Sequence, residues 1–375
     1  MKYVDEFRTP ELIAKAGKEI RKLADPKRHY RIMEVCGGHT HAIYRFGLKD
    51  LLPVNVELIH GPGCPVCVLP MGRIDDGLSL AADPSFIFAA FGDMMRVPGT
   101  HGSPLEYKAR GMDVRIVYSP ADALKLARNN PEKHVIFFAI GFETTAPSTA
   151  LTLMRAKSEG LHNFSVFCNH VTIIPAIRAI LDSPDMRLDG FVGPGHVSTV
   201  IGCRPYHWIA KDAGKPVVVS GFEPLDILQS IVMLLRQLRR GEACVENQYK
   251  RVVPWEGNRA ALRAMAEVFE LRPYFEWRGL GFISQSALKI RSSYGEWDSE
   301  QRFPVPGVRV TDPKAAQCGE VLKGVLKPAQ CKLFGRECTP EQPVGALMVS
   351  SEGSCAAYYN YEHRKPVTIA NAAPA

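Results

Sequence analysis

The 375-residue sequence contains no long hydrophobic run. Its longest apolar stretches, residues 135–140 and 216–219, have the length of a buried strand and fall far short of the roughly 20 residues that a membrane-spanning helix needs. The N-terminal segment from Met1 to Ile20 also contains no apolar run of signal-peptide length. We therefore expect a soluble protein of the cytoplasm.

Two motifs that would indicate common enzyme classes are also absent. There is no Gly-x4-Gly-Lys-Ser/Thr loop, which disfavours a nucleoside triphosphatase, and no Cys-x3-Cys-x2-Cys, which disfavours a radical S-adenosylmethionine enzyme. The net charge of +7 is scattered along the chain, and the one dense basic run, residues 236–240, ends a helical pattern. A nucleic-acid groove is therefore not indicated.

The sequence does contain short apolar strands that alternate with amphipathic helices. One helix is predicted to begin at Pro10, because proline suits the first helical position and apolar residues then recur at helical spacing. Two more helices are predicted over 224–240 and 258–270. Such alternation is typical of βαβ units and parallel sheets, so we predict an α/β fold. The predicted strands cover residues 31–36, 56–59, 86–90, 114–118, 134–140, 164–168, 190–192 and 216–220.

The chain also resembles itself at one constant offset. The segment that begins at Cys36 resembles the one at Cys168, and Gly61-Pro-Gly resembles Gly193-Pro-Gly at the same separation. Chance among common Gly-Pro turns is the alternative explanation. We infer two related Rossmann-like α/β domains with parallel sheets, whose loops meet ligands at the carboxyl ends of the strands. The expected division is an N-terminal helix in 1–30 that packs with the C-terminal domain, α/β domains in 31–130 and 131–245, and a helical, irregular domain in 246–375.

Four of the ten cysteines lie in the last, proline-interrupted region, as Cys318-x12-Cys331-x6-Cys338-x16-Cys355. Four thiolates are the ligand set of a [4Fe-4S] cluster or of structural zinc. The spacing alone does not decide between them, although the lack of a Cys-x2-Cys pair in this region favours the cluster. Four free cysteines packed in a core are the remaining alternative.

Three more cysteines lie in glycine-rich loops that follow predicted strands. Cys36 begins Cys-Gly-Gly-His39-Thr-His41, and Gly-Pro-Gly-Cys64-Pro-Val-Cys67 has the Cys-x2-Cys spacing of dithiol redox sites. This pair could cycle between dithiol and disulfide. Its two thiolates could instead bind a soft metal together with Cys36, and His39 or His41 could supply a nitrogen ligand or a proton.

Other polar residues follow the predicted strands with a weaker signal. Each could serve the site or be a solvated or helix-capping group. These weaker candidates are Asp93, Glu143, His196 and Glu223.

Three cysteines remain outside these motifs. Cys168 and Cys244 are predicted to pack in the core, and the role of Cys203 is undecided.

Together these motifs resemble the HypD family, the maturation factors of [NiFe]-hydrogenases. The resemblance implies a scaffold on which the Fe(CN)2CO group of the hydrogenase active site is assembled. In that family, iron is held between the cysteine of the first motif and the N-terminal cysteine of a small chaperone, HypC. A further partner, HypE, presents a cysteine-bound thiocyanate as cyanide donor. The motifs are Cys36-Gly-Gly-His-Thr-His, Gly61-Pro-Gly-Cys-Pro-Val-Cys, Gly141-Phe-Glu-Thr-Thr-Ala-Pro, Gly193-Pro-Gly-His-Val-Ser and the C-terminal cysteine quartet.

On this sequence the resemblance implies Cys36 as the iron ligand and a redox-active pair at Cys64 and Cys67. It also implies a [4Fe-4S] cluster on Cys318, Cys331, Cys338 and Cys355. Because cleavage of a thiocyanate takes two electrons, we expect a relay from the cluster through the dithiol toward the iron loop.

Two polar groups are expected near these centres. His39 is the candidate for positioning or protonating a group near iron, with His41 second. Glu352, three residues before Cys355, could tune the cluster or contact a partner, or be a solvated carboxylate.

The main alternative function is a stand-alone thiol–disulfide oxidoreductase with a cluster as electron donor, which would not need Cys36. A zinc-stabilised interaction protein comes third, and its lack of colour would distinguish it from an iron–sulfur protein. For the scaffold we expect a monomer that joins a hetero-complex. Its chaperone is expected to dock on the apolar residues Met94, Met95 and Val97.

Overall fold

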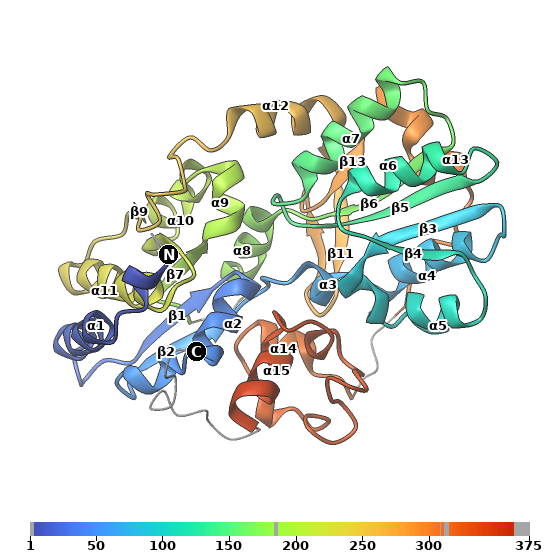
Figure 1. Ribbon diagram of the computed structural model, residues 1–375. Helices are drawn as coiled ribbons and strands as arrows, with labels where there is room; N and C mark the ends of the chain where they lie inside the picture. Colours follow the sequence, from blue (N-terminus) through green and yellow to red (C-terminus); the bar gives the residue numbers. More distant parts are fainter. Residues whose placement is uncertain (1–3, 184–186, 308, 311–314, 364–375) are drawn as a thin grey trace.

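The computed structural model describes residues 4–183, 187–307, 309–310 and 315–363, which fold around two separate parallel sheets (Figure 1). A five-stranded sheet has the order β2-β1-β7-β8-β9, and a four-stranded sheet has the order β4-β3-β5-β6. The predicted α/β class is confirmed, and all eight predicted strands are present. The strands are β1 (Tyr30–Glu34), β2 (Val56–His60), β3 (Phe86–Phe91), β4 (Val114–Val117), β5 (His134–Gly141), β6 (Phe164–His170), β7 (Gly190–Pro194), β8 (Val217–Ser220), β9 (Val245–Asn247), β10 (Phe269–Leu271), β11 (Tyr274–Trp277), β12 (Gly281–Ser284) and β13 (Leu288–Ile290).

The three predicted helices are present as α1 (Pro10–Leu23), α11 (Pro224–Arg240) and α12 (Arg259–Val268). In the parts of the chain that the structure describes, no helix has both the length and the apolar character to cross a membrane. The other helices are α2 (Gly37–Arg45), α3 (Pro65–Val68), α4 (Met71–Ala81), α5 (Pro104–Ala109), α6 (Pro120–Asn129), α7 (Ala146–Ser158), α8 (Ile173–Leu181), α9 (Gly195–Ile201), α10 (His207–Lys211), α13 (Ser299–Arg302), α14 (Cys318–Leu322) and α15 (Ser354–Tyr358). Short 3-10 helices are η1 (Asp5–Phe7), η2 (Leu48–Leu51), η3 (Gly92–Arg96), η4 (Arg204–Tyr206), η5 (Ser292–Trp297), η6 (Pro328–Gln330) and η7 (Ala346–Met348), and η8 (Tyr359–His363) is a single turn of π-helix.

The N-terminal helix was expected to pack with the C-terminal domain. It packs instead on the helical layer that covers the five-stranded sheet. Helix α1 lies along α11, and α11 contacts β7 and β8. The buried face of α1, with Ala16 and Ile20, joins the same core as Ile231 of α11 and Val218 of β8. Burial of this apolar face against α11 is what places α1 there, and its periodicity alone could not name the partner.

The four-stranded sheet is completed by a later part of the chain. Residues of β5 are buried along nearly its whole length, as a central parallel strand requires. Helix α12 packs on α7, and β13 lies against β6, so that Val268 and Trp297 share a core with this sheet. The expected third domain at 246–375 is therefore divided, and its first half belongs to the four-stranded sheet.

The two sheets also divide the chain differently from the expected boundaries at residues 130 and 245. Strands β1 and β2 join β7–β9 in one sheet, while β3–β6 form the other. The chain therefore crosses between the sheets after β2 and returns after β6. Strand and helix patterns reveal βαβ units, but they do not state which strands pair, and this is why the boundaries were wrong.

The constant offset seen in the sequence does not mark a repeat of whole domains. It relates β1, before Cys36, to β6, which contains Cys168 and lies in the other sheet. It does relate the loops at Gly61 and Gly193, which both lie at the carboxyl ends of strands of the five-stranded sheet.

The described residues 315–363 form short helices and turns that lie beside α2 and α3, at the bottom of Figure 1 between the two sheets. Helix α15 packs against α2, and η7 packs against α3. Because α2 and α3 follow the Cys36 and Cys64 loops, this irregular region is held directly against the predicted site.

Candidate functional site

A cleft of about 550 Å³ opens where loops of both sheets meet the C-terminal region. Its walls come from the carboxyl ends of five strands, β1, β2, β3, β5 and β7, together with residues 350–352. Open α/β sheets bind ligands at this end of their strands. The polar and sulfur-containing lining residues are Cys36, Cys64, Asp93, Thr144, Thr145, His196, Thr199, Ser350, Ser351 and Glu352.

Cys36 stands between the end of β1 and the first turn of α2, and its side chain lines the cleft while it is 8% exposed. Its backbone N–H donates to Glu34, whose carboxylate also accepts from the Thr40 hydroxyl and lies 2.7 Å from Nδ1 of His60. Burial, with the Glu352 and Glu34 carboxylates, raises the pKa of the Cys36 thiol well above its ordinary value. Glu34 is thus an anchor of this loop that the sequence motifs did not single out.

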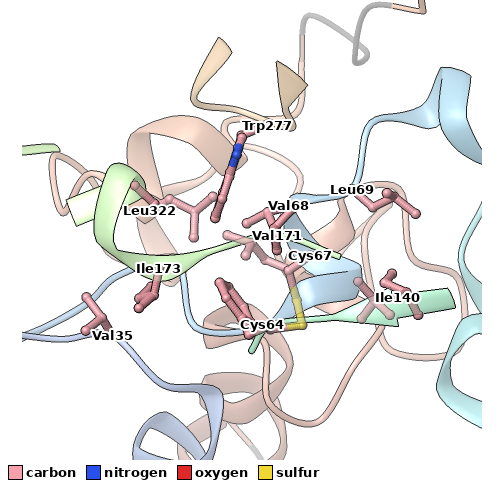
Figure 2. Packing of buried hydrophobic residues seen from close by; sticks show 14 of the residues in the cluster. Val35, Cys64, Cys67, Val68, Leu69, Ile140, Val171, Ile173, Trp277 and Leu322 are labelled. Atoms are coloured by element: carbon pink, nitrogen blue, oxygen red, sulfur yellow. A yellow bond between two sulfur atoms is a disulfide. The ribbon is translucent and has the colours of Figure 1, made fainter. Parts of the chain in front are cut away.

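Cys64 and Cys67 are joined by a disulfide. Figure 2 shows the disulfide among apolar side chains that include Val35, which directly follows β1, Ile140 of β5 and Leu322 of α14. The disulfide is thereby shielded from water, apart from the side on which Cys64 lines the cleft.

Close backbone contact brings this disulfide to Cys36. The carbonyl of Gly63 accepts from the N–H of Gly37 at 3.1 Å. A Cβ atom on Gly63 would stand 2.5 Å from the Cα of Cys36, so only glycine permits this approach. The two glycine-rich motifs are therefore parts of one sulfur-containing site.

One short segment, residues 352–355, lies against the Cys36 loop and the Cys64–Cys67 disulfide and also contains a cysteine of the C-terminal quartet. A Cβ atom on Gly37 would meet Glu352 at 2.5 Å, and one on Gly353 would meet Sγ of Cys67 at 3.2 Å. Two residues further on, Cys355 belongs to the C-terminal quartet. Burial, then Asp93 and Glu34, raise the pKa of Glu352. Glu352 therefore lies at the cleft beside the Cys36 loop, while its own segment leads to the quartet.

The four C-terminal cysteines line one apolar cavity. Its walls include Val321, Leu333, Phe334, Leu347 and Met348. The N–H of Gly345 donates to Sγ of Cys338 at 3.4 Å, and burial, then the other three cysteines, raise the pKa of Cys355. Among the described residues, no group of three or more His, Cys, Asp or Glu side chains has the geometry of a single-ion site. The structure thus brings together all four residues of the predicted ligand set: Cys318, Cys331, Cys338 and Cys355.

The histidines are arranged differently from the expectation. His39 is fully buried, and its Nε2 lies 3.2 Å and 3.0 Å from the carbonyl oxygens of Ser220 and Gly221. His41 is half-buried and is not among the residues that line the cleft; its ring meets Tyr361 edge-on, and its Nδ1 lies 3.4 Å from the carbonyl oxygen of Ser351. His196 lines the cleft. Burial lowers the pKa of His39 and of His196.

The weaker candidates divide between the cleft and its supports. Asp93 lines the cleft, and burial raises its pKa. Glu143 is buried behind the cleft, where one oxygen accepts from the N–H of Ile173 and burial raises its pKa to about 7. Glu223 pairs with Arg8 at 3.0 Å, which is a structural role.

Two groups of residues lie outside the cleft. Cys168 and Cys203 are fully buried. Cys244 was predicted to pack in the core, but it is exposed. The expected docking patch was wrong, because Met94, Met95 and Val97 are buried core residues of the described chain.

Known proteins resemble this chain over nearly its whole length. The model of the HypD family, described as "Hydrogenase formation hypA family", matches residues 11–362. A "Hydrogenase maturation factor HypD" of Rhodobacter capsulatus is 56% identical over 370 residues, which cover 96% of this chain and 98% of that protein. The HypD of Escherichia coli strain K12 is 54% identical over 370 residues, covering 97% of this chain and 99% of that protein. The chain therefore belongs to the HypD family of hydrogenase maturation factors.

Proposed function

We propose that this maturation factor is the scaffold on which the Fe(CN)2CO group of a [NiFe]-hydrogenase is assembled. A HypC-type chaperone would share the iron with it, and a HypE-type protein would donate cyanide, in a hetero-complex in the cytoplasm. One observation carries the proposal: Cys36 and Cys64, one of the two cysteines of the disulfide, line the same cleft, and the contact of Gly63 with Gly37 holds their loops together.

Cys36 is the proposed protein ligand of the incoming iron. Low-spin Fe(II) carrying cyanide and carbon monoxide suits a soft thiolate ligand. The side chain stands at the wall of a cleft of about 550 Å³, which leaves room on its open side for a second thiolate and for diatomic ligands. The Glu34 carboxylate fixes the Cys36 backbone, so the sulfur has a defined direction.

The cysteine quartet is the proposed site of a [4Fe-4S] cluster. Its residues fit that group, because four thiols line one apolar cavity and a backbone N–H already points at one sulfur. In a cubane each thiolate binds its own iron, so the four sulfurs need not converge on one point. When bound, the cluster supplies single electrons. Residues 353–355 run from the sulfur of Cys67 to Cys355, which offers electrons a short way through one segment of chain.

The reduced Cys64–Cys67 pair is the proposed electron donor for release of cyanide. The S–C bond of the donor's thiocyanate breaks, the donor sulfur and the cyanide each take one thiol proton, and the Cys64–Cys67 S–S bond forms. This step is balanced, since the dithiol gives two electrons. Renewal of the dithiol then needs two protons from solvent and two electrons, which an external donor of the ferredoxin class would deliver one at a time.

The test is infrared spectroscopy with iron analysis of the anaerobic protein, co-expressed with its HypC-type partner. Bands of bound cyanide and carbon monoxide should be present in the wild type and absent in Cys36→Ala, while about four irons of the cluster remain. Cys64→Ser should also keep the cluster and lose the bands, whereas Cys244→Ala, at an exposed position outside the cleft, should keep both.

The same experiment separates the alternative functions. Bands that persist in Cys36→Ala would refute its role as the iron ligand. A wild type with four cluster irons and no bands would instead favour the stand-alone thiol–disulfide oxidoreductase, and a colourless zinc protein would refute both redox functions.

A further inference from the structure

The ring of Phe222 lies between two imidazoles. Its centroid is 4.5 Å from that of His39, with 24° between the planes, and 3.8 Å from that of His196, with 20° between the planes. These are stacked arrangements at close distance. Phe222 follows β8, His39 belongs to α2 after β1, and His196 belongs to α9 after β7. One phenyl ring thus joins three loops of the five-stranded sheet.

Glycine residues leave space for the Phe222 ring on both of its sides. A Cβ atom on Gly38 or on Gly195 would stand 2.9 Å from an edge carbon of Phe222, closer than side chains normally approach. Both glycines precede a histidine of the stack. Without side chains at these two positions, each imidazole can lie flat against the phenyl ring.

The His39 end of the stack is anchored to backbone carbonyl groups. Nε2 of His39 donates to the carbonyls of Ser220 and Gly221, which directly precede Phe222. The backbone N–H of His39 donates to the carbonyl of Cys36 at 2.9 Å. The stack is therefore tied at one end to the Cys36 loop and to the loop that carries Phe222.

The other end of the stack is open to the cleft. His196 lines the cleft with Cys36 and Cys64, whereas His39 is fully buried and is not among the lining residues. Within the described structure, the His196 ring stacks on Phe222 and makes no other ring contact and no side-chain hydrogen bond. Its orientation toward the cleft therefore depends on the phenyl ring.

We propose that Phe222 is a positioning residue, which holds the His196 imidazole at the cleft by stacking it against the anchored His39. This inference rests on the proposed function, since the cleft is where the iron ligands would be assembled. It also assigns the two histidines different parts, because His196 meets the cleft and His39 acts through the stack.

The experiment compares Phe222→Leu with Phe222→Tyr in the full chain co-expressed with its HypC-type partner. Leucine keeps apolar volume and loses the ring, and tyrosine keeps the ring. Phe222→Leu should reduce the cyanide and carbon monoxide bands by roughly two- to tenfold, the range that an aromatic stack contributes. Phe222→Tyr should restore them. By histidine NMR, the pKa of His196 should rise in the leucine variant, because the imidazole is then freer to meet water.

Phe86→Leu is the matched control, because Phe86 also contacts a histidine, His134, but at the amino end of β3. It should change neither the bands nor the His196 titration. Wild-type bands and an unchanged His196 titration in Phe222→Leu would overturn the inference. So would an equal loss in Phe222→Tyr, or a loss of bands that accompanies loss of the cluster. If the wild type itself shows no bands, the proposed function fails, and the His196 titration still decides whether Phe222 positions this ring.

Discussion

Replacement of Gly63 by alanine tests whether the contact between the two glycine-rich loops sets the geometry of the site. The new Cβ atom would stand 2.4 Å from the backbone N of Gly37 and 2.5 Å from the Cα of Cys36. Ordinary contacts begin at 3.4 Å, so the loops must separate by about 1 Å, the difference between 3.4 and 2.4 Å. Both contacts are with backbone atoms, which cannot rotate away as a side chain can. The hydrogen bond from Gly37 to Gly63 is then weakened or broken.

Two consequences of different size are expected from this displacement. Overpacking of a close contact costs typically about 1–3 kcal/mol of stability, which a chain of this size can tolerate. A shift of about 1 Å between reacting groups can reduce a rate by roughly 100-fold. Gly63→Ala should therefore fold and bind the proposed cluster, yet show little or no infrared signal from bound cyanide and carbon monoxide.

The assay combines the infrared bands, visible absorption of the cluster and thermal unfolding. Gly17→Ala is the matched control, because its Cβ atom would meet its nearest neighbour, the carbonyl oxygen of Leu51, at an ordinary 3.6 Å inside α1. It should keep the bands and raise the stability by about 0.4–1 kcal/mol. Full wild-type bands in Gly63→Ala would show that the distance between Cys36 and the disulfide does not limit assembly.

Three further outcomes follow from other parts of the structure. Gly345→Ala should lose the visible absorption of the cluster, because its Cβ atom would lie 2.4 Å from Sγ of Cys318; a retained spectrum would contradict the cavity geometry. Arg251→Leu should lower the free energy of unfolding by about 3 kcal/mol, because it leaves the fully buried Asp226 without its bidentate partner; an unchanged melting temperature would count against this. Burial lowers the pKa of His170 from 6.5 to about 4. Between pH 6.5 and about 4 the unfolded chain therefore binds more protons than the folded one. The free energy of unfolding should fall by up to about 3 kcal/mol as the pH drops through this range. His170→Gln should flatten that pH dependence of the melting temperature and exposed His101→Gln should not, so equal slopes in all three proteins would refute it.

The elements of the fold could be predicted because their signals are local. Each parallel strand is a short apolar run, and α11 shows an apolar face over its full length. Pairing of strands is not local. The chain leaves the first sheet after β2 and returns after β6, and no periodicity within 56–60 or 164–170 records that choice. The expected domain boundaries failed for this reason, although the strands themselves were correct.

The site shows the same division between local and non-local information. Cys36, Cys64 and the four C-terminal cysteines could be selected from residue type and spacing, and the structure gathers them into the cleft and one adjoining cavity. Met94 and its neighbours look like a surface in the sequence but are core residues, because exposure depends on what packs above them. The chemical role of a cysteine can be predicted from its residue type and spacing, whereas the burial of a side chain cannot, because it depends on the tertiary structure.

Positioning groups lie furthest from what a motif can express. Glu34 holds the Cys36 backbone from the preceding strand, and Phe222 reaches the same loop from the end of β8, in a distant part of the sequence. Neither residue type is distinctive in the sequence, since glutamate is normally a surface residue and phenylalanine an ordinary part of a core. The available signal is indirect and lies in the glycines: Gly38, Gly63 and Gly195 each stand where a Cβ atom would collide with another loop. Glycines beside a candidate ligand therefore predict a close approach, and the structure is needed to say which group approaches.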